Sequence, residues 1–111
     1  MSYGGGHGTV EASISLNNVA PGTPTGSVVD LGVVFSQPVC QVVGGAGISA
    51  GVVTLEGSLD GTSFYPVGVT PSLAAPGTFV ATGTVPARYL RARVSTATVG
   101  GNVTAKVGAG A

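Results

Sequence analysis

The stretch VTLEGSLDGTSFYPVG, residues 53–68, predicts a β-hairpin. An alternating strand leads into Asp60-Gly61, and an aromatic segment follows. Aspartate before a glycine that can take a positive φ is a favoured pair for a two-residue hairpin turn. A cation site is the alternative, but Ca²⁺ takes several oxygen ligands and Glu56 lies about 13 Å away along an extended strand. We therefore interpret Asp60 as the corner of the hairpin.

The composition predicts an all-β domain around this hairpin. The 111 residues include 20 glycines and 7 prolines, helix-forming Glu, Lys, Gln and Met are scarce, and β-branched residues are abundant. Strand-like runs are separated by turn signals at intervals of about 8–12 residues. We expect a single antiparallel β-sandwich, jelly-roll or immunoglobulin-like, of about seven or eight short strands over residues 9–111. The glycine-rich residues 1–8 are expected to form a flexible N-terminal arm.

Period-two alternation and breaker residues locate the strands. The first, residues 9–16, is expected to gather four apolar side chains on one face: Val10, Ala12, Ile14 and Leu16. Residues 27–35 are apolar on both faces, so we expect that strand to be central in its sheet. Pro38 is expected to interrupt the strand, because proline has no N–H to donate to the backbone hydrogen bonds of a sheet. The remaining strands are expected at residues 39–43, 52–59, 62–67, 78–84, 89–94 and 102–107.

The charge of the chain argues against two classes of partner. Four basic and four acidic residues give a formal net charge of zero, whereas nucleic-acid-binding domains usually carry a basic surface. No apolar run approaches the roughly 20 residues that span a bilayer. We therefore expect neither a nucleic-acid nor a membrane partner. The opening MSYGGGHG lacks the basic and apolar regions of a signal peptide, so we expect a protein made in the reducing cytoplasm of its host.

Three features could suggest an enzyme. Residues 47–51, GISAG, match the G-x-S-x-G pattern of a nucleophile elbow, but that elbow needs a helix after Ser49 and the following residues read as a strand. His7, the only histidine, lies in the arm, which is a poor support for a general base. Cys40, the only cysteine, lies in an apolar run and is expected to be a buried small residue. We predict no catalytic residue, metal ligand or cofactor.

The richest candidate for a contact surface is the segment PARYLRARV, residues 86–94, which holds three of the four basic residues. Arg91 and Arg93 share a face with Tyr89 and could bind carboxylates, phosphate or sugar hydroxyls on a partner. The alternative is a solvated strand face balanced by acids such as Glu56 on a neighbouring strand. The candidate partner contacts of the whole chain are Tyr3, His7, Tyr89, Arg91 and Arg93.

The hairpin and the arginine-rich strand together carry a resemblance to known proteins. The pattern V-x-L-E-G-S-x-D-G-x-x-F, followed by A-R-Y-L-R-A, resembles a set of small glycine- and threonine-rich virion proteins of tailed bacteriophages, over residues 52–107. More distantly, the S-x-D-G and A-R-Y motifs resemble discoidin-type, galactose-binding-like sandwiches, although this chain is shorter and lacks their cysteine pair.

The closer resemblance implies a non-enzymatic structural protein of the virion, either a capsid decoration or cement protein or a head-fibre β-domain. The implied partner is the major capsid protein, and the implied location is the capsid surface. We expect a small homo-oligomer, with a trimer favoured. The alternative function is a carbohydrate-binding β-domain of a phage tail or fibre, for which the aromatic candidates are Tyr3, Tyr65 and Tyr89.

Overall fold

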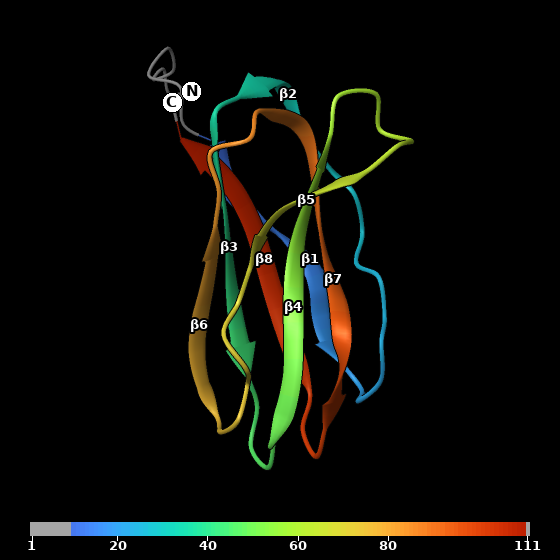
Figure 1. Ribbon diagram of the computed structural model, residues 1–111, viewed down its shortest axis with the longest axis vertical. Helices are drawn as coiled ribbons and strands as arrows, with labels where there is room; N and C mark the ends of the chain where they lie inside the picture. The colour runs from blue at the N-terminus through green and yellow to red at the C-terminus, as the bar shows by residue number, and fades with distance from the viewer. Residues whose placement is uncertain (1–9, 111) are drawn as a thin grey trace.

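The computed structural model describes residues 10–110, which form two four-stranded antiparallel sheets packed face to face (Figure 1). One sheet has the order β1-β8-β3-β6 and the other β2-β7-β4-β5. The strands of the first sheet are β1 (Val10–Val19), β8 (Val103–Gly110), β3 (Gln37–Gly44) and β6 (Gly77–Thr82). Those of the second are β2 (Val29–Phe35), β7 (Ala87–Val99), β4 (Ala50–Ser58) and β5 (Tyr65–Val69). The predicted all-β sandwich is confirmed.

The strand order identifies the topology as a jelly roll. Antiparallel pairs join β1 to β8, β2 to β7, β3 to β6 and β4 to β5, as in one long hairpin wound into two layers. Of the two sandwich types expected, the chain therefore adopts the jelly roll. Within the described part of the chain, no helix is long and apolar enough to cross a membrane.

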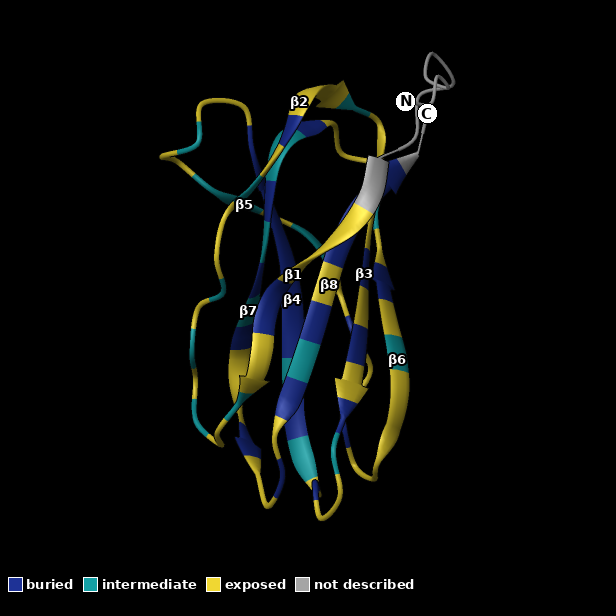
Figure 2. Ribbon diagram, turned by 180° about the vertical axis from the view of Figure 1, so that it is seen from behind, coloured by how far each residue is buried: buried dark blue, intermediate teal, exposed yellow. Residues whose placement is uncertain are grey.

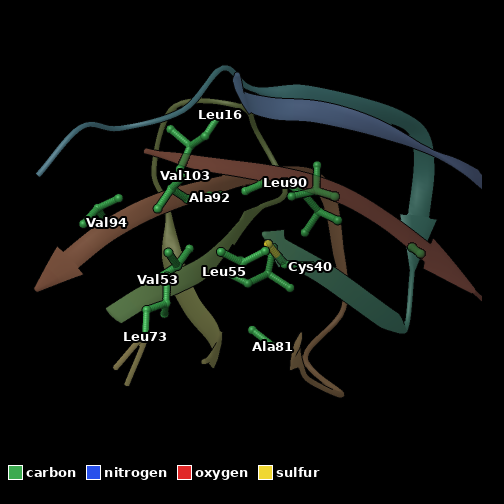
Figure 3. Packing of buried hydrophobic residues seen from close by; sticks show 14 of the residues in the cluster. Leu16, Cys40, Val53, Leu55, Leu73, Ala81, Leu90, Ala92, Val94 and Val103 are labelled. Carbon is green, nitrogen blue, oxygen red and sulfur yellow. The ribbon is translucent and has the colours of Figure 1, made fainter. Parts of the chain in front are cut away.

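The core between the sheets consists mainly of small and medium aliphatic side chains (Figure 3). β7 and β8 follow the predicted alternation over residues 90–94 and 103–107, where every second side chain points inward. Leu73, from the connection between β5 and β6, is fully buried, and Phe35 and Phe79 pack partly buried against the cluster. The fully buried aliphatic residues include Leu16, Val42, Val53, Leu55, Leu90, Val94, Val103 and Val107.

The prediction that the apolar residues of β1 share one face is wrong. Ile14 is 47% exposed whereas Leu16 is 2% exposed, so these two residues do not share a face. The register of β1 against β8 shifts between Ile14 and Leu16, and Ser15 between them is also buried. A β-bulge adds a residue on one strand and turns the following side chains to the other face. Ala12 is exposed like Ile14.

The strand at β2 is an edge strand, so the expectation that it is central is wrong. It pairs with β7 at Val29 and Asp30, but the register then breaks until Phe35. Gly32 has a φ of 87°, and its N–H donates to Oδ1 of Asp30 over 2.8 Å. The strand thus kinks away from β7 over residues 31–34. Leu31 remains buried, whereas Val33 and Val34 are exposed, so the apolar residues of β2 are not buried on both faces.

Pro38 lies inside β3 and does not interrupt it, contrary to the prediction. The N–H of Gly45 donates to the carbonyl of Asn102 over 2.8 Å, so odd-numbered residues of β3 bond to β8 and even-numbered ones face β6. The ladder with β6 ends at Val39, one residue after Pro38. The missing N–H therefore falls at the end of the contact with β6, where only the carbonyl of Pro38 bonds, accepting from the N–H of Gly83; a proline near a strand start is tolerated.

The connection between β1 and β2, residues 20–28, runs beside β7 (Figure 1). Gly26 donates to the carbonyl of Ala92 over 2.7 Å, and Val94 and Thr98 donate to carbonyls of this connection over 3.0 Å each. The connection thus satisfies main-chain groups of β7 that β2 leaves unpaired, and it holds the arginine-bearing strand in place.

Candidate interaction surfaces

The loop between β4 and β5 is built around Asp60. Its Oδ1 accepts hydrogen bonds from the N–H groups of Thr62 and Ser63, over 2.8 and 2.9 Å, and from the hydroxyl of Ser58 over 2.8 Å. Gly61 follows with a φ of 80°. The prediction that Asp60 forms the corner is confirmed, but the two-residue turn is wrong, because the strands end at Ser58 and resume only at Tyr65.

These hydrogen bonds also account for the acidity of Asp60. The N–H groups of Ser63 and Thr62, together with the Ser58 hydroxyl, stabilise the carboxylate and lower its pKa to about 2. Through Oδ1, the carboxylate of Asp60 thus organises its own loop. In the part of the chain that the structure describes, no three His, Cys, Asp or Glu residues gather into a possible metal site.

The same loop packs over the outer face of β7. The guanidinium carbon of Arg91 lies 3.9 Å from the centre of the Phe64 ring, which is a cation–π contact. The ring of Tyr89 lies against Gly61, since a Cβ on that glycine would stand 3.4 Å from it. Arg88 adds a second cation–π contact, 5.1 Å from the centre of the Tyr89 ring.

Arg91 and Arg93 share one carboxylate, that of Glu56 on β4. Their Nε atoms donate to Oε1 and Oε2 respectively, each over 2.8 Å. Glu56 is only 7% exposed, and although this burial raises its pKa, the hydrogen bonds from Arg93 and Arg91 outweigh it and hold the pKa below the ordinary value. The hypothesis that Glu56 on a neighbouring strand balances the arginines is confirmed.

We call Tyr89, Arg91 and Arg93 with Glu56 and Phe64 the arginine strip. Its two cations and one anion leave one net positive charge. No hydrogen bond within residues 10–110 uses the terminal amino groups of Arg91 or Arg93, whose side chains are 26% and 38% exposed. Those groups could donate to a carboxylate on a partner. The structure therefore brings together three of the five predicted contacts; Tyr3 and His7 lie outside the described residues.

The third clustered arginine, Arg88, has a separate partner. Its Nε and Nη2 atoms donate to the two carboxylate oxygens of Asp30 over 3.0 and 3.2 Å. The hydrogen bond from Arg88, followed by that from the Gly32 N–H, lowers the pKa of Asp30. Both side chains of this pair are at least 40% exposed, so the pair belongs to the solvated surface.

Ser49 and Cys40 have structural surroundings. Ser49 follows a turn at Gly47 and leads directly into β4, and its N–H donates to the carbonyl of Val99 over 2.9 Å. A strand therefore stands where a nucleophile elbow would have a helix. Cys40 is buried as predicted, and this burial raises the pKa of its thiol to about 12.

A second surface, which the sequence patterns did not reveal, is the outer face of the sheet β1-β8-β3-β6 (Figure 2). In β3 the exposed Val39, Gln41 and Val43 alternate with buried residues. Val80 of β6 stands opposite Gln41. Lys106 of β8 also stands opposite Gln41 and is the one charged residue among the described side chains of this face. We call Ile14, Val39, Val43 and Val80 the valine face; they are 37–50% exposed.

A shallow cavity adjoins the valine face where β3 and β6 separate. It measures about 430 Å³ and offers hydroxyl, amide and main-chain groups with no charge. It could accommodate a neutral polar group, for example an amide of a partner chain. The residues that line it are Gln37, Pro38, Val39, Thr82, Gly83 and Thr84.

Comparisons with known proteins identify no relative. A search against protein-family models found no match, and searches against curated proteins and solved structures found none either. The function has to be inferred from the two surfaces and from the fold.

Proposed function

We propose that the protein is a non-enzymatic structural component of a virion, which binds the outside of a phage capsid and reinforces it. The observation that carries this proposal is the valine face, an open sheet surface with four exposed aliphatic side chains and a single charge. The aliphatic side chains are interspersed with the neutral Gln41 and with Lys106, and such a mixed surface of low charge is typical of a protein contact. A capsid presents a broad protein surface against which such a face can pack.

The energetics suit a repeated contact. Burial of apolar surface is worth roughly 25 cal/mol per Å², so a few half-exposed valines give modest affinity for each copy. Many copies bound across the joints of a lattice then add to the stability of the whole shell through multivalency. Lys106 at the centre of the face would favour a partner with an acidic group facing it.

Two further observations support the virion assignment. The jelly roll is a recurrent architecture of viral capsid and lectin domains, although a fold by itself does not determine function. The hairpin and arginine-strand motifs resemble virion proteins of tailed phages, as described above. The valine face and the arginine strip lie on the outer sides of opposite sheets, so one flat partner contacts only one of them.

The alternative, a carbohydrate-binding domain of a tail or fibre, would need an open aromatic platform. Phe64 is covered by Arg91, and Tyr89 lies against Gly61. The hydroxyl of Tyr65 donates to the carbonyl of Pro86 over 2.6 Å. Because Phe64, Tyr65 and Tyr89 already have partners within the chain, these residues form no open platform, which supports the capsid-binding proposal.

The decisive experiment is a titration of purified capsids, from the phage that carries this gene, with the full chain. We expect saturable binding, a loss of affinity of tenfold or more for Val43→Lys, and no change for Arg93→Ala. The reverse pattern would move the contact to the arginine strip. Absence of saturable binding, or of the protein from intact particles analysed by mass spectrometry, would overturn the proposal.

A further inference from the structure

Each of the two sheets has two edge strands, and the four differ in how they are protected. An edge strand exposes unpaired N–H and C=O groups, which proteins normally shield with bulges, prolines, kinks or charges. β1 has three register shifts against β8. β2 kinks at Gly32 and carries the ion pair between Asp30 and Arg88. β5 is five residues long, contains Pro66 and has a register shift.

β6 has none of these devices. Its sequence, GTFVAT, has no charge and no proline, and it pairs with β3 in unbroken register over its whole length. The neutrality extends well beyond the strand, because residues 61–87 contain no charged side chain. β6 also lies at the outermost position of its sheet in both views (Figures 1 and 2). Among the four edges, it is therefore the one with an unbroken register and without a proline, a kink or a charge.

The hydrogen-bond pattern tells which groups of β6 face outward. The N–H of Gly83 donates to the carbonyl of Pro38 over 3.3 Å, so odd-numbered residues from 77 to 83 bond toward β3. The N–H and C=O groups of Thr78, Val80 and Thr82 then point away from the sheet. No strand within residues 10–110 pairs with this edge.

One end of the edge is partly covered. A Cβ on Gly68 of β5 would stand 2.3 Å from the carbonyl oxygen of Thr82, so the backbone of β5 lies against that carbonyl. At the other end of β6, a Cβ on Gly77 would meet only the ring of Phe79 within 4 Å, so the backbone of β5 does not reach this end. The open part of the edge is therefore the pair of residues that flank Phe79.

We propose that β6 pairs antiparallel with β6 of a second copy, around a two-fold axis at Phe79. Thr78 of each copy then stands opposite Val80 of the other, and the outward N–H and C=O groups of these residues form four hydrogen bonds. The two sheets β1-β8-β3-β6 join into one continuous sheet of twice the width, and their valine faces lie on the same side.

Self-pairing fits this edge for two reasons. A two-fold contact places each segment against its own copy, which would oppose like charges, and the neutral stretch of residues 61–87 removes that cost. The axis also sets Phe79 against Phe79 of the second copy, and aromatic cross-strand pairs are favourable. Pairing with a strand of the capsid is the competing outcome of the test below.

This proposal does not rest on the capsid-binding function, because it concerns the free protein. A two-fold contact gives a dimer, whereas the sequence resemblance favoured a trimer. Sedimentation velocity and native mass spectrometry of the full chain, over a range of concentrations from micromolar to hundreds of micromolar, discriminate between them. We expect a reversible monomer–dimer equilibrium.

The variant Val80→Pro tests the edge directly. It removes one outward N–H, keeps an apolar side chain, and deletes no hydrogen bond to β3. We expect the dimer dissociation constant to rise at least tenfold. Val43→Lys is the matched control, because it adds a charge to the same face on the central strand β3 and leaves the edge intact; its dimer should persist.

Amide hydrogen exchange in the wild-type protein provides a readout that does not depend on the folding of any variant. The N–H groups of Thr78 and Val80 should exchange slowly at high protein concentration and fast on dilution, while that of Phe79 stays protected throughout. A protein that is monomeric or trimeric at all concentrations would overturn the proposal. So would exchange rates at Thr78 and Val80 that do not change with protein concentration. So would a dimer that Val43→Lys dissociates and Val80→Pro does not, which would indicate packing through the valine face.

Discussion

Arg91 stands directly opposite Glu56 in the ladder between β7 and β4, and its Nε donates to Oε1 over 2.8 Å. Arg93, two residues further along β7, uses the other oxygen of the same carboxylate. The strip that first suggested a partner site is thus also a structural clamp on β4. The exposed terminal amino groups are the part of it that can serve a partner.

Glu56→Gln should destabilise the protein by about 1–3 kcal/mol, because it leaves two neighbouring guanidinium groups without their shared anion. Chemical unfolding monitored by circular dichroism measures the change. Asp30→Asn, which breaks an ion pair of similar geometry on the open surface, is the control and should cost less than about 0.5 kcal/mol. Equal losses of unfolding free energy for the two substitutions would contradict a structural role for Glu56 between β4 and β7.

Asp60 should make stability depend on pH in the acid range. Its pKa of about 2 in the folded protein lies below the ordinary 3.8, so folding favours the ionised form. The resulting stabilisation is present above about pH 4 and is lost as the pH falls toward about 2. The difference in unfolding free energy between wild type and Asp60→Asn should therefore shrink over this window. A difference that stays constant down to pH 2 would contradict the assignment.

Cys40 should be unreactive in the folded state. Its side chain is fully buried and its pKa is about 12, so the thiolate is scarce at pH 8. A thiol reagent such as dithiobis(nitrobenzoate) should label it only when denaturant unfolds the chain. Complete labelling within minutes without denaturant would mean that the core opens far more readily than its packing implies.

Gly26→Ala should be among the most damaging single-methyl changes. The added Cβ would stand 2.3 Å from Oγ of Ser15 and 2.8 Å from the carbonyl of Ala92, where the β1–β2 connection lies against β7. We expect a loss of about 2–4 kcal/mol. Gly32→Ala is the control: its φ of 87° costs about 1–2 kcal/mol, but the new methyl group meets no atom within 4 Å. The first variant should melt at a clearly lower temperature.

Ser15→Ala should weaken the same junction from the other side. Oγ of Ser15 accepts the buried N–H of Ala92 over 2.9 Å and donates to the carbonyl of Ser27 over 2.8 Å. Loss of the hydroxyl leaves that N–H unpaired, which costs about 1–3 kcal/mol. Ser13→Ala, two residues away on the exposed side of β1, should change the unfolding free energy by less than about 0.5 kcal/mol.

Sequence patterns predicted the strands best where the ladder is regular. Leu90, Ala92 and Val94 of β7 alternate as expected, because a strand between two neighbours cannot slip without exposing its apolar side. The face of β1 was mispredicted because bulges depend on the partner strand β8, which lies at the far end of the sequence. β2 seemed central because both its faces are apolar, yet an edge strand that leaves the sheet can carry the same composition.

The arginine strip could be predicted from the sequence, whereas the valine face could not. The clustered charges of Arg91 and Arg93 are evident in the sequence, and an acid such as Glu56 on a neighbouring strand was the expected counter-charge. No cluster of charged residues identifies the valine face in the sequence. Val39 and Val43 flank buried residues in an apolar run, and only the pairing of β3 with β8 and β6 establishes that both point outward.

The pairing of β1 with β8 affects how the protein folds during its synthesis. Residues 10–19 have no partner in their sheet until residues 103–110 have left the ribosome. Such sequence-distant pairing is a slow kind of folding, and it leaves the first strand unpaired until β8 has been synthesised. A chain truncated before β8 cannot close the jelly roll and should be a substrate for chaperones and proteases.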